Sequence, residues 1–314
     1  MKVLVTGSSG HLGEALMRSL DEHERRGLDV LPSPFTHDVA SIVDRKAVRE
    51  AMRGVDVVLH TATLHKPHVA THDKEAFVEV NVRGTLVLLE EALAAKAAFV
   101  FTSTTSTFGR ALVPPPDEPA AWINEDVTPI PKNIYGVTKV AAESLCELFH
   151  RSHGLPVIVL KTSRFFPEED DDTNVARAYH PDNAKVNELL YRRADIADMV
   201  LAHRCAIAKV REIGFGRYIV SARTPFGPGD LAALRADAPS VVRRIVPELD
   251  ADYTRLGWTM FPSIDRVYSS RRAEEELGWR PQWDFAHALA RLRAGDSPWS
   301  PLAHAIGAKG YHRT

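Results

Sequence analysis

The sequence predicts an α/β protein whose core is a doubly wound parallel sheet, with a smaller C-terminal substrate-binding lobe. Three observations point to this class. A short apolar run at residues 3–5 leads directly into a glycine loop and a helical pattern. Further short apolar runs alternate with helical segments, and after Lys161 this alternation gives way to segments rich in Pro, Arg and Trp. The alternation is that of a Rossmann-type fold, which we expect to comprise residues 1–165 and 186–220, with the lobe formed by residues 166–185 and 221–314.

The elements follow from the apolar pattern in chain order. After the first strand, apolar positions recur at helical spacing through Ala15, Leu16 and Leu20. A second strand is expected at residues 28–31, because the apolar residues there stop at a Pro-Ser-Pro sequence. Later strands are expected at residues 55–58, 98–101 and 157–160, the last preceded by a helix over residues 140–150.

The composition excludes several classes of protein. The 314 residues carry 39 basic and 41 acidic side chains, a formal net charge of −2, so no overall field draws the protein to nucleic acid or to a membrane surface. No apolar stretch approaches the roughly 20 residues that span a bilayer, and no secretory signal precedes the first strand, so we expect a cytoplasmic protein. Cys146 and Cys205 lack metal-ligand spacing and are interpreted as packing thiols.

The first functional motif is the glycine loop at residues 6–13. Gly7 permits a tight turn off the strand, Gly10 lets the backbone approach a pyrophosphate, and Gly13 allows the helix to pack close to the sheet. The N-terminal end of that helix faces the phosphates. Because the spacing is TGxxGxxG and not GxGxxG, a glycine-rich turn without any ligand stays open as an alternative.

The second motif pairs Tyr135 with Lys139. A separation of four places both side chains on one face of a helix, one turn apart. An ammonium group beside a phenol favours the phenolate, so Tyr135 can exchange a proton with a substrate hydroxyl near neutral pH. The hydroxyl-rich strand end at Ser103 and Thr104 adds a second group suited to the same chemistry.

Taken together, these residues resemble the extended short-chain dehydrogenase/reductases, also called the NAD-dependent epimerase/dehydratase family. The resemblance covers nearly the whole chain and rests on eight landmarks in the family's order. They are residues 6–13, 38–39 (Asp-Val), 60–62 (His-Thr-Ala), 81–85 (Asn-Val-Arg-Gly-Thr), 103–109, 135–139, 195–198 (Asp-Ile-Ala-Asp) and 276–281 (Glu-Leu-Gly-Trp-Arg-Pro).

The resemblance implies a role for each matching residue. Tyr135 becomes the acid/base catalyst, Thr104 holds the substrate oxygen, and Lys139 supports Tyr135 and contacts the nicotinamide ribose. The resemblance also implies a homodimer and a cofactor site that consists of Gly7, Gly10, His11, Leu12, Gly13, Asp38, Val39, Thr61, Ala62, Asn81 and Lys139.

The departures from the family concern the substrate. Members that remove water from nucleotide sugars carry Asp-Glu after the catalytic threonine, whereas Thr105 and Ser106 follow it here. Arg164 stands where nucleotide-sugar members have asparagine, and Glu188 where they have a diphosphate-binding arginine. A nucleotide diphosphate is therefore disfavoured, and we expect Arg164 to hold a carboxylate or phosphate of an anionic substrate. The alternative is a surface salt bridge from Arg164 to the acidic run at residues 168–172.

The sequence contains only a weak signal for the choice between NAD and NADP. The expected second strand passes almost at once into a short loop, so Asp29 falls too early in that strand to contact the adenosine ribose. The resemblance alone therefore favours NAD, and NADP stays open.

Two further clusters have structural interpretations. His65, His68 and His72 are closely spaced, but a proline interrupts the helix that would align them, so no metal site is expected. Lys66 in the same loop is expected to face the substrate. The acidic run at residues 168–172 is interpreted as a solvated loop.

The predicted function is that of an NAD(P)-dependent oxidoreductase. It would transfer hydride between nicotinamide and a secondary alcohol in a sugar or sugar derivative, with Tyr135 as the acid/base. Its partner is then a small-molecule substrate, and neither nucleic acid nor a membrane is expected as a partner. Two alternatives stay open: a nucleotide-sugar 4-epimerase that retains its NAD, and a non-catalytic NAD(P)-sensing protein.

Overall fold

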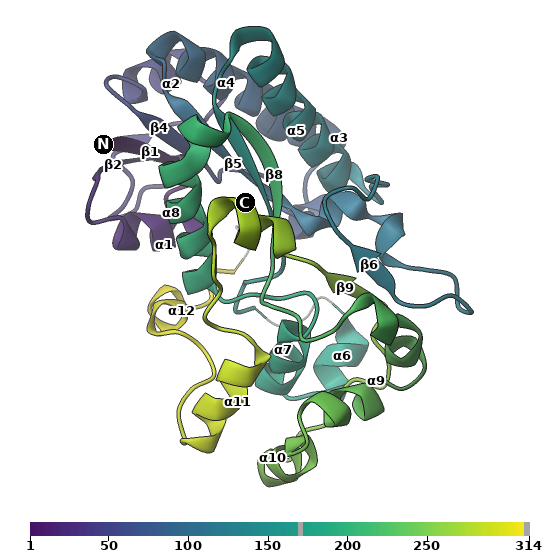
Figure 1. The fold of residues 1–314 in the computed structure, drawn as a ribbon. Helices are drawn as coiled ribbons and strands as arrows, with labels where there is room; N and C mark the ends of the chain where they lie inside the picture. The colour runs from purple at the N-terminus through teal and green to yellow at the C-terminus, as the bar shows by residue number, and fades with distance from the viewer. Residues whose placement is uncertain (169–171, 311–314) are drawn as a thin grey trace.

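The computed structural model describes residues 1–168 and 172–310, and its centre is a seven-stranded parallel sheet (Figure 1). The strand order is β3-β2-β1-β4-β5-β7-β8, and it changes direction between β1 and β4. This confirms the predicted Rossmann-type sheet and places a crevice at the carboxyl ends of β1 and β4. The strands are β1 (Lys2–Thr6), β2 (Glu24–Asp29), β3 (Asp38–Val39), β4 (Val57–His60), β5 (Ala98–Thr104), β7 (Val157–Thr162) and β8 (Phe215–Val220).

Helices cover both faces of this sheet (Figure 1). Successive strand residues point to opposite faces, so Val3 and Val5 join one hydrophobic cluster while Leu4 joins the other. Burial on both faces explains why the central strands β1, β4, β5 and β7 are nearly continuous apolar runs in the sequence. One face packs against α1 (His11–Ser19) and α8 (Ile196–Ile213), and the other against α2 (Arg45–Ala51), α4 (Gly84–Ala95) and α5 (Ile134–His153), with α3 (Lys74–Phe77) beside α5.

A smaller lobe, formed mainly by the chain after β7, packs closely against the sheet. Most of its buried hydrophobic residues belong to the same cluster as Leu160 of β7, and the fully buried Trp279 donates a hydrogen bond from its indole N–H to the carbonyl of Asp198 in α8, at 3.0 Å. The lobe contains α6 (Thr173–Ala178), α7 (Pro181–Leu189), α9 (Leu231–Ile245), α10 (Leu249–Leu256), α11 (Phe285–Arg293), α12 (Pro301–Ile306) and a small parallel sheet of β6 (Ala121–Ile123) and β9 (Arg266–Tyr268).

Short helical turns complete the chain between these elements. One of them, the π-helix η2 (Val78–Arg83), leads without a break into α4. The other turns are η1 (Lys66–Ala70), η3 (Thr105–Phe108), η4 (Arg110–Leu112), η5 (Pro228–Asp230) and η6 (Ala273–Leu277).

The expected domain boundary at residues 185–186 falls inside α7 (Pro181–Leu189). No helix of the described residues combines the length and apolar character that a membrane crossing requires.

Candidate active site

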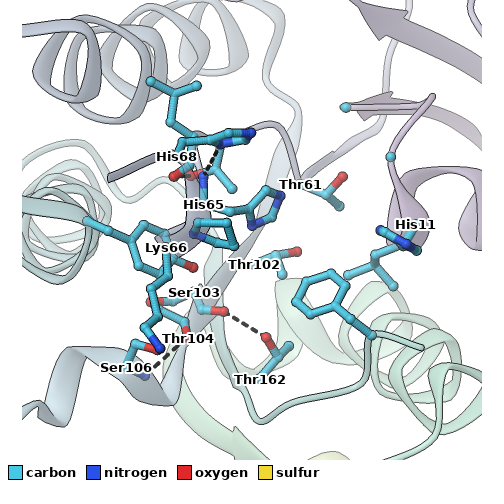
Figure 2. Close-up of a pocket in the computed structure, with 18 of the residues that line it drawn as sticks. His11, Thr61, His65, Lys66, His68, Thr102, Ser103, Thr104, Ser106 and Thr162 are labelled. Atoms are coloured by element: carbon cyan, nitrogen blue, oxygen red, sulfur yellow. Dashed lines mark hydrogen bonds between the residues drawn. The ribbon is translucent and has the colours of Figure 1, made fainter. Parts of the chain in front are cut away.

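The carboxyl ends of β1, β4, β5 and β7 open into one cavity of about 600 Å³. Figure 2 looks into it. Most of the residues predicted for the site line this cavity, and four lie outside the lining: Asp38, Val39, Asn81 and Lys139. The predicted residues that line it are Gly7, Gly10, His11, Leu12, Gly13, Thr61, Ala62, Lys66, Thr104, Tyr135 and Arg164.

The three glycines of the loop have different roles. Gly7 has a φ of +73°, and a Cβ there would lie 2.7 Å from the Ala62 nitrogen, while a Cβ at Gly13 would lie 1.9 Å from the Gly7 carbonyl. Gly10 borders the cavity, and a Cβ there would meet only the Gly7 carbonyl, at 3.3 Å. The helix that begins at His11 leaves the N–H groups of its first turn without intrahelical acceptors. The loop therefore fits the pyrophosphate of a dinucleotide.

Asp29 is a candidate that the sequence reasoning misplaced. β2 ends at Asp29 and does not occupy the expected residues 28–31, because its polar first half pairs in register with β1. The Asp29 carboxylate borders the cavity and accepts hydrogen bonds from the backbone nitrogens of Ser9, at 2.9 Å, and Leu31, at 3.0 Å. A carboxylate at the end of this strand is positioned to accept hydrogen bonds from ribose hydroxyls.

Asp38 and Val39 lie outside the lining of the cavity, so their assignment to the adenine site stays a prediction. The guanidinium of Arg26 donates two hydrogen bonds to the Asp38 carboxylate, at 2.6 and 2.8 Å. The Val39 side chain is 59% exposed. Residues 40–42, which follow directly, line the cavity instead. The predicted segment therefore lies within a few residues of the cavity lining.

Thr104 and Tyr135 border the same cavity and come from different elements. Thr104 is the last residue of β5, and its hydroxyl accepts a hydrogen bond from the Ser106 nitrogen at 3.1 Å. Tyr135 lies in the first turn of α5, which Asn133 caps through its side chain. Figure 2 shows Lys66 extending toward Thr104 and Ser106 from the opposite loop. A substrate hydroxyl in this space meets hydroxyl groups from two fixed elements.

Lys139 lies one turn after Tyr135 but behind the cavity wall. Its ammonium group donates to the Thr102 carbonyl at 2.7 Å and lies 4.1 Å from the centre of the Phe101 ring. Burial lowers the pKa of Lys139 to about 7, against an opposing effect of Glu143. The side chain is directed at the strand and does not border the cavity, so the expected contact with a ribose is not formed in this arrangement.

A second buried cluster joins α5 to β5 and β7. The Lys161 ammonium group lies 2.7 and 2.8 Å from the two Glu143 carboxylate oxygens and donates to the Thr107 hydroxyl at 2.9 Å. The Ser103 hydroxyl also donates to Glu143. A buried network whose charges are paired and hydrogen-bonded holds its elements rigidly. The cluster therefore fixes the end of β5 relative to the helix that carries the tyrosine.

Asn81 fixes a loop and does not border the cavity, and its role in cofactor binding stays a prediction. Its side-chain oxygen accepts hydrogen bonds from the Leu64 nitrogen, at 2.8 Å, and the Thr63 hydroxyl, at 2.9 Å. Its side-chain nitrogen donates to the Leu64 carbonyl and to the Thr138 hydroxyl, each at 3.1 Å. These four bonds use the whole capacity of an asparagine side chain and tie the loop after β4 to α5.

The histidine loop forms one wall of the cavity. The His65 nitrogen donates to the His68 ring at 2.9 Å, and the His68 nitrogen donates to the His65 carbonyl at 3.0 Å. The ring centre of His65 lies 6.4 Å from that of Tyr135 and 5.7 Å from that of Phe166. Within residues 1–168 and 172–310 no group of three or more metal-ligating side chains occurs.

Arg164 lies in the cavity wall and forms an ion pair with Glu188 at 3.2 Å. Arg192 and Arg193 bind the same carboxylate, at 2.6 and 2.7 Å, and Glu188 is only 1% exposed. Burial raises the pKa of Glu188, but the three guanidinium groups outweigh that effect and lower the pKa to about 2. Arg164, Arg192 and Arg266 all line the cavity. The carboxylate at the position of an expected arginine is thus bound by two arginines close to it in the sequence and by Arg164, which follows the end of β7.

Glu168, the first residue of the acidic run at residues 168–172, forms a buried contact, so the interpretation of the run as a solvated loop is wrong for this residue. Glu168 lies 2.7 Å from the His11 ring nitrogen and accepts a hydrogen bond from the Lys309 nitrogen at 3.1 Å. Residues 169–171 lie outside the described part of the chain. The expected alternative for Arg164, a salt bridge to this run, falls partly on those residues.

Comparison with known families gives a match that covers most of the chain. A family model described as "NAD dependent epimerase/dehydratase family" matches residues 3–217. This range includes the glycine loop and the elements that carry Thr104, Tyr135 and Arg164.

Individual proteins agree with the family match. The dTDP-glucose 4,6-dehydratase of Streptomyces antibioticus is 28% identical over 96% of this chain and 95% of that protein. The uncharacterized protein y4nG of Sinorhizobium fredii is 33% identical over 50% of this chain and 39% of that protein. A solved structure of a short-chain dehydrogenase/reductase superfamily protein of Agrobacterium tumefaciens with bound NAD has a TM-score of 0.64 and 23% identity, and it covers 94% of this chain and 98% of that one. This last likeness extends the agreement in fold to the lobe.

Proposed function

Because the chain belongs to the NAD-dependent epimerase/dehydratase family, we propose that it catalyses hydride transfer between NAD and a secondary alcohol of a sugar substrate. The observation that carries the proposal is that Tyr135 and Thr104 border the same cavity as a glycine loop that fits a pyrophosphate. NAD, when bound, supplies the nicotinamide carbon that accepts a hydride from the substrate carbon.

The chain's own residues position the substrate and move its proton. The Thr104 hydroxyl donates a hydrogen bond to the substrate oxygen, and Tyr135 as phenolate removes the proton from that oxygen. In the reverse direction the Tyr135 phenol returns the proton. Lys139 lies one helical turn after Tyr135, behind the cavity wall. With a pKa of about 7 it is partly protonated at neutral pH, and its protonated form stabilises the Tyr135 phenolate.

Asp29 favours NAD over NADP. Its carboxylate at the end of β2 is positioned to accept hydrogen bonds from ribose hydroxyls, and its negative charge opposes a 2′-phosphate. Calorimetric titration should therefore give tighter binding of NAD than of NADP. Binding of NADP that is tighter by about tenfold or more, or 1.4 kcal/mol, would reverse the assignment.

The cavity favours oxidation and reduction over loss of water. A dehydratase needs a group that protonates the leaving hydroxyl. In the described part of the chain the carboxylates that line the cavity are Asp29 and Glu168, and both lie at the glycine-loop end. Thr105 and Ser106 occupy the position after the catalytic threonine. Although a dTDP-glucose 4,6-dehydratase is among the relatives, the chain is therefore proposed to act as a dehydrogenase or an epimerase.

The substrate is proposed to carry an anionic group. Arg164, Arg192 and Arg266 line the end of the cavity that the lobe provides, and guanidinium groups bind carboxylates and phosphates by paired hydrogen bonds. Nucleoside-diphosphate sugars and sugar acids both meet this requirement. The relative that acts on dTDP-glucose makes the nucleotide sugars the first compounds to test.

The decisive experiment incubates the purified protein with NAD and a panel of these two compound classes. Accumulation of NADH identifies a dehydrogenase. Conversion of the sugar without net NADH, by a protein that retains NAD through gel filtration, identifies an epimerase. A protein that binds NAD but converts no member of the panel, and whose Tyr135→Phe variant behaves identically, would favour a nucleotide sensor.

A further inference from the structure

We propose that the tail formed by residues 307–310, which follow α12, belongs to the cofactor site: Lys309 and Gly310, together with Glu168 and His11, form a latch that controls how fast the dinucleotide leaves the cavity. The proposal rests on the proposed function, because it requires NAD to bind beside the glycine loop. It adds a role for residues that follow the last helix, far in the sequence from the nucleotide-binding motifs.

The latch connects two walls of the cavity. His11 begins α1 at the end of the glycine loop, Glu168 follows β7 where the lobe begins, and both line the cavity. The His11 ring nitrogen lies 2.7 Å from the Glu168 carboxylate, and these side chains are only 8% and 13% exposed. Figure 2 shows His11 across the cavity from the histidine loop. The two walls therefore meet beside the helix turn that fits the phosphates.

The tail holds this contact from outside the cavity. The backbone nitrogens of Lys309 and Gly310 donate to the carboxylate oxygen that faces His11, at 3.1 and 3.2 Å. The Lys309 ammonium group donates to the Ser9 carbonyl at 2.8 Å and also binds the Glu14 carboxylate. Neither tail residue lines the cavity. Residues 309 and 310 thus join the two walls of the cavity from outside, and they do not occupy the space in which a ligand would bind.

Lys309 also compensates a negative charge at this helix end. Glu14 lies in the first turn of α1, close to where phosphates would bind. Burial raises the pKa of Glu14, but its contacts with Lys309 and Arg18 outweigh this effect, so the pKa is lowered and the group is ionised. A carboxylate near a phosphate site weakens phosphate binding unless a cation offsets it. Lys309 provides that cation.

Release of a dinucleotide requires the two walls to separate. The fraction of molecules with separated walls depends exponentially on the free energy of the contacts that join them, so losing one hydrogen bond to a charged group increases that fraction about tenfold or more. The dissociation rate should rise by the same factor, because release occurs from the open state.

The test measures release of NAD from the full-length protein. Protein loaded with radiolabelled NAD is chased with unlabelled NAD, for the wild type and for Glu168→Ala and Lys309→Met. Both variants should release NAD about tenfold faster or more. Lys309→Arg keeps the cation and should restore slow release. Lys46→Met, at an exposed lysine of α2, is the matched control and should release NAD at the wild-type rate.

Each outcome decides a specific claim. If Glu168→Ala does not fold, as judged by circular dichroism, Lys309→Met carries the test, because its side chain is partly exposed and its loss leaves the backbone contacts in place. Wild-type release rates in folded Lys309→Met reject the latch while the proposed function stands. Failure of the wild-type protein to bind NAD rejects the proposed function, and the latch with it.

Discussion

A buried glutamate lies behind the wall at each end of the cavity, Glu143 behind the proposed catalytic end and Glu188 behind the proposed substrate end, and their counterions differ in kind. Glu143 is paired with Lys161, and nearby Lys139 has a pKa that burial lowers to about 7. Glu188 is bound by arginines. A buried lysine changes its charge readily, whereas an arginine stays protonated. The catalytic end is thereby suited to moving a proton, and the substrate end to holding an anion.

The largest effect is expected at the catalytic end. Tyr135→Phe removes the group that exchanges the proton and keeps the ring that packs in the wall, so kcat should fall by about two or more orders of magnitude. Affinity for NAD should stay unchanged. Steady-state kinetics on the substrate, once identified, and calorimetry with NAD measure the two quantities. Near-normal turnover would remove Tyr135 from the mechanism.

Gly10→Val tests whether the catalytic end includes the cofactor. The valine side chain would enter the space for the pyrophosphate, so NAD binding should be abolished while the fold is kept, because a Cβ at Gly10 meets only the Gly7 carbonyl at 3.3 Å. Gly13→Ala is the contrasting variant: its Cβ would lie 1.9 Å from that carbonyl and should lower the melting temperature. A folded Gly10→Val protein with wild-type affinity for NAD excludes the loop as the binding site.

At the substrate end, Arg164→Ala should change affinity and leave the chemical step intact. The expected result is a higher KM for the substrate, corresponding to about 2–5 kcal/mol of lost binding, with little change in affinity for NAD. The reason is that a guanidinium group in the cavity wall contacts an anion without taking part in proton transfer. A lower kcat at an unchanged KM would show that Arg164 acts in the chemical step and not in substrate binding. That result would contradict the division of the cavity into a catalytic end and a substrate end.

The smallest expected effect is a change in stability. The variant concerned, Lys139→Met, should lose activity but gain stability. Lys139→Met should inactivate the protein and raise its free energy of unfolding by about 1–3 kcal/mol at and below pH 7, because a buried charge is removed. In the wild type, folding releases a proton between the folded pKa of about 7 and the unfolded value near 10.4. Wild-type stability therefore rises with pH across that window, and the advantage of the variant shrinks. Denaturant unfolding at several pH values measures this.

Lys161→Met is the control for that prediction. Lys161 is also buried, but it is paired with Glu143, so its removal takes the nearest counterion from a buried carboxylate, leaves only Arg217 at 3.9 Å, and should destabilise the protein by about 3–5 kcal/mol. If Lys139→Met and Lys161→Met lower the free energy of unfolding by the same amount, the ion pair between Lys161 and Glu143 does not account for the stability of the protein in the way proposed.

The glycine loop and the Tyr135–Lys139 pair can be predicted from the sequence because their features are local. A strand, a glycine turn and a helix are adjacent in the chain, so the spacing of Gly7, Gly10 and Gly13 is interpretable without the rest of the fold. The same holds for Tyr135 and Lys139, which share a helix face. That Thr104 reaches the same cavity follows once the strands are recognised as parallel, since their carboxyl ends meet at one edge.

The remaining features depend on pairing between distant segments. Asp29 was misplaced because register with β1, and not an apolar pattern, sets the end of β2. The contacts of Asn81 and Glu168 are not predictable from local spacing, because their partners lie on a separate loop and at residues 309–310. Arg192 and Arg193 follow Glu188 by four and five residues, but Arg164 reaches it only because the chain after β7 lies beside the end of α7. No local spacing in the sequence encodes the contacts between distant segments.

A crystal structure of the protein with NAD tests the division of the cavity most directly. The nicotinamide should lie in front of Tyr135 and Thr104, the pyrophosphate against the first turn of α1, and the adenosine ribose at Asp29, with the arginine-lined end left for the substrate. A nicotinamide directed away from Tyr135, or a dinucleotide whose phosphates lie on Arg164 and Arg192, would contradict the assignment of the two ends.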